Sequence, residues 1–235
     1  MNEDLKEYYE KCYSDVANGG AGGAVQRIFH VALERPFDTS DRFENVLELG
    51  ATNAEHLRFI RHEFTTYTML DINDSETARV AAADASSHQH RVEFVVDDAQ
   101  TLGNVPDCSV DRLISMCLLH HLSEPDDALR RWQAVVKPGG QISIFVPCDP
   151  GALWRMGRRL TTFRRARSHG YSHQQIRYLN ALDHRNHIAS LIAMTQSIFA
   201  KDTVKVTWYP TRFLASWNIN LFVTIQIKRR PSDLA

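Results

Sequence analysis

Acidic side chains end three successive apolar segments of the sequence, and this pattern is the most informative about chemistry. They are Glu48 in "NVLELG", Asp71 in "YTMLDI" and Asp98 in "RVEFVVDD". If the segments are parallel strands, their carboxyl ends meet at one edge of a sheet, where nucleotide ligands bind. Asp71 follows a glycine-containing turn by about 20 residues, which suits hydrogen bonds from a ribose diol. A helix cap is the alternative for any one aspartate, but three such acids together favour a cofactor site.

The loop after the first segment keeps only part of a glycine turn. In "VLELGATNAEHL" (46–57), Thr52 and Ala54 follow Gly50 at positions where a cofactor-binding turn carries glycine. Thr52 is the larger departure, because a β-branched side chain resists positive φ; Asn53 tolerates that region better, so the strained position is expected there. The Thr52 hydroxyl and the Asn53 amide could also bond the cofactor directly. The alternative is a loop that has lost its ligand.

Histidines in two segments are candidates for a general base. His121 stands in "LLHHL", directly after the fourth apolar segment, and His187 stands in "LDHRNHIASL". A base is needed only if the attacking nucleophile must lose a proton. A structural histidine bonded to backbone is the alternative, and we favour it for His120. His184 and His187 are spaced to share a ligand on a helix, but no cysteine has metal-binding spacing, so we predict no metal site.

The segment 151–170 contains many arginines and no acidic residue. Its apolar residues recur at helical spacing, which predicts one basic amphipathic helix. It could be a cover helix with a solvated face, a contact with an anionic membrane through 151–167, or a lid that recognises an anionic substrate. We favour the lid. The substrate-binding candidates are Arg155, Arg158, Arg159, His184, Asn186, Tyr209 and Asn218.

The order of apolar and helical segments predicts how these residues are positioned. Five short apolar segments between residues 45 and 147 alternate with helical patterns, which is typical of βαβ units in a parallel sheet. Helices are expected after Asn53, from Asp74 and from Ser123, the last closing at "KPGG" (137–140). Residues 151–200 are helical in pattern, with a break at "SHGYS" and a capping box from Ser172 to Gln175.

Both ends of the chain add to this body. Two further strands, "VKVTWYP" and "LFVTIQIKR", are joined by a loop too short for a helical crossover, so we expect them to be antiparallel. Tyr209 and Asn218 in this tail could instead be core or structural residues. Residues 1–40 are predicted to form a helical flap with a hinge at "NGGAGG" (18–23), and residues 41–235 the main domain with a helical lid at 151–200.

Residues 45–147 resemble the class I S-adenosylmethionine-dependent methyltransferases. "VVDDAQTL" and "CLLHHLSEPDDALRRWQAVVKPGGQISIFVP" carry the resemblance better than the first loop does. It implies a Rossmann-like seven-stranded α/β sheet whose last strand is antiparallel, S-adenosylmethionine as cofactor and S-adenosylhomocysteine as product. The positions it implies are Glu48, Gly50, Ala51, Thr52 and Asn53 at the methionine end, Asp71 and Ile72 at the ribose, Asp98 and Ala99 at the adenine, and Met116 and Cys117 near the sulfonium. It also implies that His121 lies close to the reacting methyl group.

Composition limits the class of protein. The 235 residues suffice for one α/β domain, and 27 basic against 28 acidic side chains exclude a globally basic nucleic-acid binder. Four dispersed cysteines and an acidic N-terminus lead us to expect a cytoplasmic protein without disulfides. We expect a methyltransferase acting on an oxygen or nitrogen of a small or medium-sized acceptor. The alternatives are a degenerate methyltransferase fold that binds or regulates, and a nicotinamide-dependent oxidoreductase.

Overall fold

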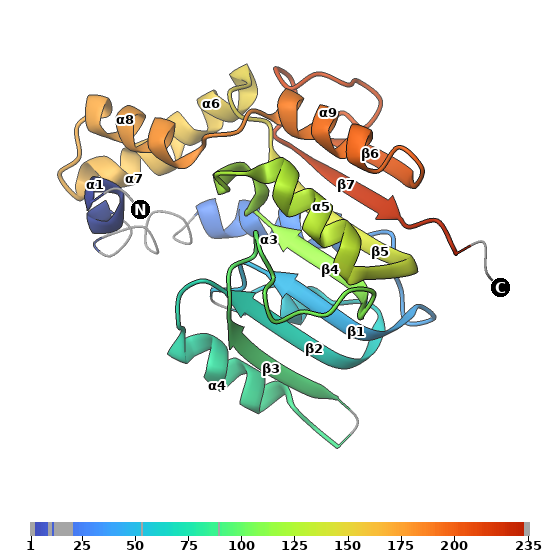
Figure 1. Ribbon diagram of the computed structural model, residues 1–235. Coiled ribbons are helices and arrows are strands. Elements are labelled where there is room, and N and C mark those ends of the chain that lie inside the picture. Colours follow the sequence, from blue (N-terminus) through green and yellow to red (C-terminus); the bar gives the residue numbers. More distant parts are fainter. Residues whose placement is uncertain (1–2, 9–10, 12–20, 53, 89, 233–235) are drawn as a thin grey trace.

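A seven-stranded mixed sheet forms the centre of the molecule (Figure 1). The computed structural model describes residues 3–8, 11, 21–52, 54–88 and 90–232. The strand order is β3-β2-β1-β4-β5-β7-β6, and β7 is antiparallel to both of its neighbours. The strands are β1 (Arg42–Leu49), β2 (Glu63–Asp71), β3 (Arg91–Val96), β4 (Val110–Met116), β5 (Val136–Pro147), β6 (Thr203–Tyr209) and β7 (Phe222–Lys228). This topology confirms the predicted fold, including the antiparallel last strand.

Helices cover both faces of the sheet and extend beyond one end of it (Figure 1). The α-helices are α1 (Glu3–Tyr8), α3 (Ala21–Glu34), α4 (Glu76–Ala85), α5 (Pro125–Val135), α6 (Ala152–Leu160), α7 (Thr162–Ser168), α8 (His173–Asp183) and α9 (Ile188–Ile198). Two short 3₁₀ turns are η2 (Leu57–Phe59) and η3 (Leu119–His121). No helix within the described residues is long and apolar enough to cross a bilayer.

Alternating side chains of the strands divide the core between the two faces. Along β1, Val46 packs with α3 and α4, whereas Leu47 and Leu49 face α5 and α9. The period of two follows from the pleat of a strand, so each face receives its own set of apolar side chains. The strand order reverses between β1 and β4, and ligands of open α/β sheets bind outside the carboxyl ends of the strands at such a point.

Helix α3 is held to the sheet by a buried ion pair. The Arg112 guanidinium in β4 donates two hydrogen bonds to the Glu34 carboxylate, at 2.9 and 2.5 Å, and both side chains are fully buried. Phe29 of the same helix packs on Phe145 and Phe222 of the sheet. Although α3 lies within the segment predicted as a flap, it therefore shares the central core. The predicted hinge falls partly on residues 18–20, which lie outside the described residues.

Helices α6, α7 and α8 form an arm beyond the carboxyl ends of the strands, and α1 packs against α8 (Figure 1). The arm has a small core of its own, to which α1 contributes Leu5 and Tyr8. The arm agrees with the helical pattern predicted from residue 151, and the capping box from Ser172 to Gln175 is confirmed. Helix α9, in contrast, packs on α5 and belongs to the core of the sheet.

Several predicted helices differ from the structure. The helix predicted after Asn53 is absent from the described residues: only η2 forms, because Ala54 has φ +54° and the β-branched residues of "FTTYT" extend β2 back to Glu63. The helix predicted through 151–170 is interrupted at Thr161, which has φ −111° and ψ −85°.

Helix ends also differ from their predicted positions by one or two residues. Ser75, rather than Asp74, caps α4, because its hydroxyl accepts the Ala78 N–H. Helix α5 begins after Glu124, with proline in its first turn, instead of at Ser123. It ends at Val135, and "KPGG" then belongs to the start of β5.

Candidate active site

The ends of β1 and β2 are joined by backbone hydrogen bonds that shape the first loop. The Gly50 and Ala51 N–H groups both donate to the Leu70 carbonyl, at 2.8 and 3.2 Å. Gly50 has φ +75°, a conformation that favours glycine, and a Cβ added there would contact Leu118 at 3.4 Å. Among the described residues of this loop the other positive φ is at Ala54, whereas Asn53 lies outside them. The strained position is thus Ala54 and not Thr52, which reverses the predicted ranking of the two departures.

The Asp71 carboxylate at the end of β2 is held on both sides. Its Oδ2 accepts a hydrogen bond from the Thr52 hydroxyl at 2.7 Å, and its Oδ1 accepts from the Asn73 N–H at 2.9 Å. Asp71 is 6% exposed, and the neighbouring Ile72 is exposed. Oδ1 also accepts a longer hydrogen bond of 3.5 Å from the Asn73 side-chain amide, whereas Oδ2 has one lone pair left. The Thr52 hydroxyl therefore binds a protein carboxylate, and Oδ2 of Asp71 keeps acceptor capacity for a hydroxyl of a diol.

The ends of β3 and β4 supply the remaining predicted cofactor residues. Asp98 is half-buried, and its Oδ1 accepts the Gln100 N–H at 2.8 Å. Ala99 is buried, and its carbonyl accepts the Trp132 indole N–H. Met116 is buried, whereas the exposed Cys117 has φ +51° and turns the chain out of β4.

Glu48 has a different environment from that of the other predicted cofactor residues. It is 2% exposed, and its Oε2 accepts a hydrogen bond of 2.7 Å from the Tyr67 hydroxyl. Burial raises the pKa of the Glu48 carboxyl, and nearby His56 only partly offsets this. Glu48 thus lies inside the core beneath the loop, where its contacts are to protein side chains.

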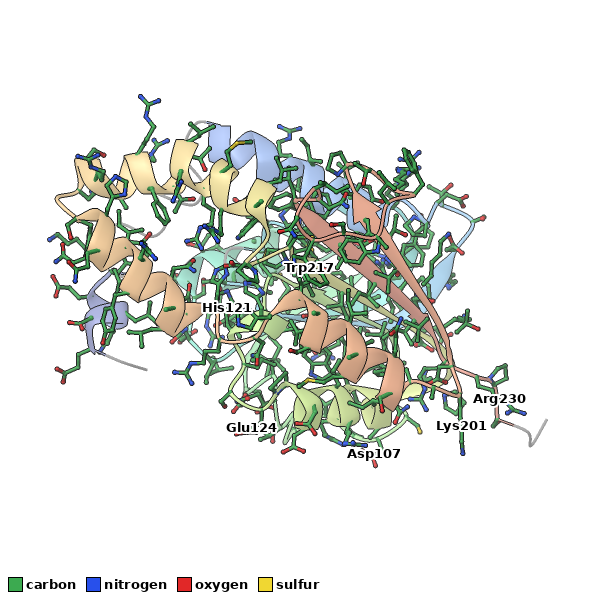
Figure 2. The ribbon with its side chains drawn as sticks, turned by 90° about the horizontal axis from the view of Figure 1, so that it is seen from above. Asp107, His121, Glu124, Lys201, Trp217 and Arg230 are labelled. Carbon is green, nitrogen blue, oxygen red and sulfur yellow. The ribbon has the colours of Figure 1, made fainter. Side chains whose placement is uncertain are left out.

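His121, in the turn after β4, lies beside the end of α8 in the arm (Figure 2). His121 Nδ1 lies 2.9 Å from the Asp183 carboxylate and 3.0 Å from the Asp183 backbone carbonyl, at the end of α8. Both acceptors require a proton on Nδ1, which leaves Nε2 of a neutral ring as a proton acceptor. A carboxylate–histidine pair of this kind fixes the tautomer and the orientation of a general base.

His120 and His184 lie beside this pair and are neutral at pH 7. Burial holds the pKa of His120 well below its ordinary value, and its ring centroid lies 4.6 Å from that of His184. Burial also lowers the pKa of His184, although its Nδ1 lies 2.8 Å from the Asp149 carboxylate. Burial alone would raise the pKa of Asp149. The nearby His184 and Arg158 more than offset this effect and lower the pKa of Asp149, so its carboxylate is ionised.

A cavity of about 230 Å³ lies between the ends of the strands, α3 and the arm. Its walls are mainly apolar and combine Phe29 and Cys117 from the body with Leu5 and Tyr8 from α1. Its polar side includes all three histidines and Asp183. Five buried side-chain atoms in its lining have no hydrogen-bond partner among the described residues: Trp154 Nε1, Arg158 Nη1, Asn180 Oδ1, His120 Nδ1 and His184 Nδ1. The cavity can therefore satisfy a ligand that both donates and accepts hydrogen bonds.

A second cavity, of about 660 Å³, lies on the arm beside the first, and Arg158 lines both. The structure brings the predicted Arg155, Arg158 and Arg159 together there and adds Arg177 from α8, which sequence reasoning missed. Asp149 is the acidic residue in its lining. The balance of charge favours an anion.

The other predicted substrate residues lie outside the two cavities. Asn186 donates from Nδ2 to the Leu122 carbonyl at 2.7 Å and so holds the segment after α8 against the histidine turn. Asn218 accepts the Ala152 N–H at the start of α6. Tyr209 stacks on Phe222. His187 is exposed at the N-cap of α9 and lies on no helix with His184, so the two do not share a helical face.

The sequence analysis did not identify Asp183 as the partner of His121 or Asp149 as the partner of His184. It also assigned His120 a structural role. Asp183 directly precedes His184 in "LDHRNH", a signal that was available, whereas nothing local pairs Asp149 with His184 35 residues later. Leu5, Tyr8 and Phe29 could not be placed from the sequence either, because their contribution to the cavity depends on how α1 and α3 fold back over the sheet.

Comparison with known proteins supports the fold. A methyltransferase-domain family model matches residues 47–144. No curated protein matches the sequence significantly. Solved structures with the same fold include an S-adenosylmethionine-dependent methyltransferase from Archaeoglobus fulgidus, with a TM-score of 0.58 and 15% identity over 94% of this chain and 100% of that one.

Two other structures show how widely the fold is used. Phosphoethanolamine N-methyltransferase 2 from Haemonchus contortus, in complex with S-adenosylmethionine, has a TM-score of 0.62 and 13% identity over 98% of this chain and 60% of that one. The [4+2]-cyclase SpnF has a TM-score of 0.59 and 17% identity over 92% of this chain and 84% of that one. Identities this low show a shared fold and leave the chemistry to the site itself.

Proposed function

We propose that the chain, whose residues 47–144 match a methyltransferase domain, is a class I S-adenosylmethionine-dependent methyltransferase that transfers a methyl group to an oxygen or nitrogen of a small or medium-sized polar acceptor. The His121–Asp183 pair in the wall of the cavity is the observation that carries this proposal. The pair would accept the proton that the acceptor loses. Nothing in the net charge of −1 suggests a nucleic-acid acceptor.

The residues at the ends of β1 to β4 suit S-adenosylmethionine. Gly50 lets the backbone approach a ligand closely, and Oδ2 of Asp71 retains a lone pair for a ribose hydroxyl. Asp98 and Ala99 would adjoin the adenine, and Cys117 the sulfonium. The bound cofactor supplies an electrophilic methyl group whose transfer leaves a neutral thioether.

Methyl transfer needs the acceptor atom in line with the methyl group, so positioning is the main task of the chain. As the acceptor's oxygen or nitrogen forms its bond to the methyl carbon, the carbon–sulfur bond breaks and its electron pair stays on sulfur. The proton of the acceptor passes to Nε2 of His121 and from there to solvent. Asp183 orients the ring and stabilises the imidazolium that forms.

The lining of the two cavities supports a polar, anionic acceptor. Within the described part of the chain, Trp154 and Arg158 offer donors, and Asn180 an acceptor, that have no hydrogen-bond partner, and the walls around them are mainly apolar. Arg155, Arg159 and Arg177 in the adjoining cavity would bind a phosphate or carboxylate group of the same molecule. This role for the arm is favoured over contact with a membrane surface because the arginines line a concavity.

Binding and turnover test the proposal separately. Calorimetry should show that S-adenosylmethionine and S-adenosylhomocysteine both bind, and no binding of either at millimolar concentration would overturn the proposal. A pool of metabolites incubated with methyl-labelled cofactor should yield a labelled acceptor. With that acceptor, His121→Ala and Asp183→Asn should reduce kcat at least 100-fold and leave cofactor affinity unchanged.

The Thr52–Asp71 hydrogen bond favours a second candidate, a degenerate member of the family that binds or regulates without turnover. In that case the hydroxyl would substitute for a ligand at the ribose position. The SpnF cyclase shows that the fold is not restricted to proteins named as methyltransferases. Transfer of the labelled methyl group to any acceptor would exclude this candidate. The antiparallel β7 separates the chain from the dinucleotide-binding fold and hence from the nicotinamide alternative.

A further inference from the structure

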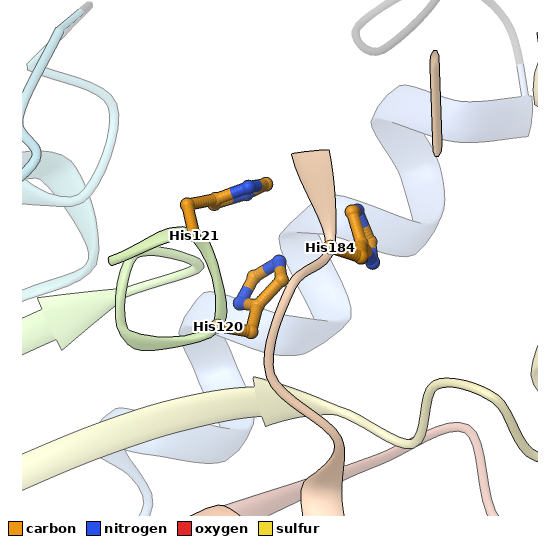
Figure 3. Close-up of side chains that lie close together, drawn as sticks. All are labelled: His120, His121 and His184. Atoms are coloured by element: carbon orange, nitrogen blue, oxygen red, sulfur yellow. The ribbon is translucent and has the colours of Figure 1, made fainter. Parts of the chain in front are cut away.

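Three histidine rings from two distant segments meet at the polar side of the first cavity (Figure 3). His120 and His121 come from the turn after β4, and His184 follows the end of α8. One ring nitrogen from each can be chosen so that all three lie within 4.8 Å of one another. Neutral imidazole nitrogens are ligands that Zn²⁺ and related transition metals prefer.

The surroundings of two of these rings match those of metal-bound histidines. Such histidines usually direct their second ring nitrogen to a carboxylate or a carbonyl, which fixes the ring. His121 directs Nδ1 to Asp183 at 2.9 Å, and His184 Nδ1 lies 2.8 Å from the Asp149 carboxylate, although not in hydrogen-bond geometry. In both rings Nε2 is then the nitrogen that remains for a ligand. Both carboxylates are largely buried, with side chains 14% and 13% exposed.

The third ring provides an independent observation. His120 is 3% exposed, and its Nδ1 has no hydrogen-bond partner among the described residues. A buried polar atom without a partner is unfavourable unless a ligand satisfies it. His120 also lines the cavity, so an ion bound by its ring would be reached from there.

We propose that His120, His121 and His184 form a binding site for one divalent transition-metal cation, with Zn²⁺ as the best match, and that its open coordination position faces the acceptor cavity. Three protein ligands with a free fourth position are the arrangement of catalytic zinc sites. The charges of Asp149 and Asp183 offset both the cation and the nearby Arg158 guanidinium, whose Nη1 lies 3.9 Å from Asp149.

The three rings must move inward when the ion binds. Bonds of about 2.0–2.1 Å at tetrahedral angles place ligand nitrogens roughly 3.3 Å apart, which is closer than the upper limit of 4.8 Å found here. His121 belongs to a 3₁₀ turn and His184 follows a helix end, so a shift of about an ångström requires only local adjustment of these segments.

The site does not depend on the proposed methyl transfer, but its use in catalysis does. An acceptor oxygen or nitrogen in the fourth position would lose its proton more readily, because a bound cation lowers the pKa of its ligand. With the ion present, Nε2 of His121 is a ligand, and the cation replaces the ring in promoting loss of that proton.

Metal binding to the full-length protein tests the proposal without cofactor or acceptor. Protein treated with a chelator and dialysed should bind one Zn²⁺ or Co²⁺ per chain by elemental analysis, and Co²⁺ should give the intense visible absorption of a four- or five-coordinate ion. His184→Ala and His121→Ala should weaken Zn²⁺ binding at least 100-fold, and Asp149→Asn about 10-fold to 100-fold. His187→Ala is the matched control, because this histidine is exposed and lies outside the cavity, and its affinity should be unchanged.

Either of two results would overturn the proposal. The first is that wild-type protein does not bind Zn²⁺ or Co²⁺ stoichiometrically at micromolar concentration. The second is that the His184→Ala variant binds Zn²⁺ as tightly as wild type. If His184→Ala does not fold by circular dichroism, His184→Gln takes its place under the same criteria. If the protein binds the cofactor but no metal, the metal site is overturned and the methyltransferase proposal stands. If it binds metal but transfers no methyl group, only the methyltransferase proposal is overturned.

Discussion

The Thr52 hydroxyl donates a hydrogen bond of 2.7 Å to the Asp71 carboxylate. The residue that departs most visibly from a glycine turn thus contacts the side chain that would bind the cofactor's ribose. With the Asn73 N–H on the other oxygen, this contact holds the carboxylate in one orientation. Because Oδ2 keeps a lone pair, the hydrogen bond should organise the site for a ribose instead of blocking it.

Removing this hydroxyl should weaken cofactor binding. Thr52→Val keeps the shape of the side chain but leaves Asp71 Oδ2 without its protein donor, so the carboxylate is held only through Oδ1. A hydrogen bond to a charged group contributes about 1.5–3 kcal/mol, so we expect the Kd for S-adenosylmethionine to rise roughly 10-fold or more. Calorimetry measures the change, and Thr52→Ser, which restores the hydroxyl, is the control. Tighter binding by Thr52→Val would identify the threonine as a competitor of the ribose.

Substitution of Ala54 by glycine should not reduce the stability of the protein, in contrast to the same substitution at an ordinary buried alanine. Its φ of +54° is unfavourable for a residue with a Cβ by roughly 1–2 kcal/mol, and glycine removes most of this strain. The greater entropy of glycine in the unfolded chain offsets part of this gain. We therefore expect Ala54→Gly to leave the free energy of unfolding unchanged or to raise it by up to about 1 kcal/mol. Ala51→Gly, at a buried neighbour without positive φ, should be destabilising. Urea titration of both variants compares them, and equal losses would contradict the assigned strain.

The buried network beneath the loop predicts sensitivity to acid. Burial and the neighbouring His56 lower the pKa of His30 to about 3, and burial and Arg112 lower that of His62 to about 4. Because these values lie below those of the unfolded chain, the unfolded state binds more protons as the pH falls from about 6.5 toward 4. The free energy of unfolding should therefore decrease by about 1.4 kcal/mol per pH unit for each group over this window.

Comparing variants isolates the contribution of His30. His30→Phe keeps a ring stacked on Phe59 and should flatten the pH dependence of the free energy of unfolding between pH 6.5 and 4. The total slope is a less direct measure, because burial raises the pKa of Glu48 and makes its contribution run in the opposite direction. His88→Phe, at an exposed position, should leave the slope unchanged. An identical slope in wild type and His30→Phe would rule out this assignment.

Charge reversal on the arm should separate acceptor binding from cofactor binding. Arg158→Glu combined with Arg159→Glu places two carboxylates in the arginine-lined cavity, so the KM for an anionic acceptor should rise at least 10-fold. The Kd for S-adenosylmethionine should not change, since that site lies at the strand ends. Arg164→Glu, an exposed position outside both cavities, is the matched control. A KM equal to that of the control would assign the arginines to a solvated surface.

The strands were predictable because each has its own pattern of buried residues, and "LLHHL" and the acids at strand ends fixed one edge of the sheet. The absence of a helix after Asn53 was not predictable. It depends on the conformation of Ala54 and on His56, which is buried and hydrogen-bonded to Glu34 of α3 at 2.9 Å. The same holds for the histidine site. His121 could be identified from the residues around it in the sequence. Its pairing with Asp183 could not, because it depends on the end of α8 lying beside the turn after β4.

The two halves of the proposed active site come from separate parts of the molecule. The residues that would bind the cofactor stand on the sheet, while most residues that would contact the acceptor come from the arm, which has a small core of its own with α1. Exchange of residues 152–183 for the corresponding arm of a related protein would alter which acceptor is recognised without altering the strand ends. Descendants of such a scaffold can therefore diversify in acceptor while keeping one methyl donor.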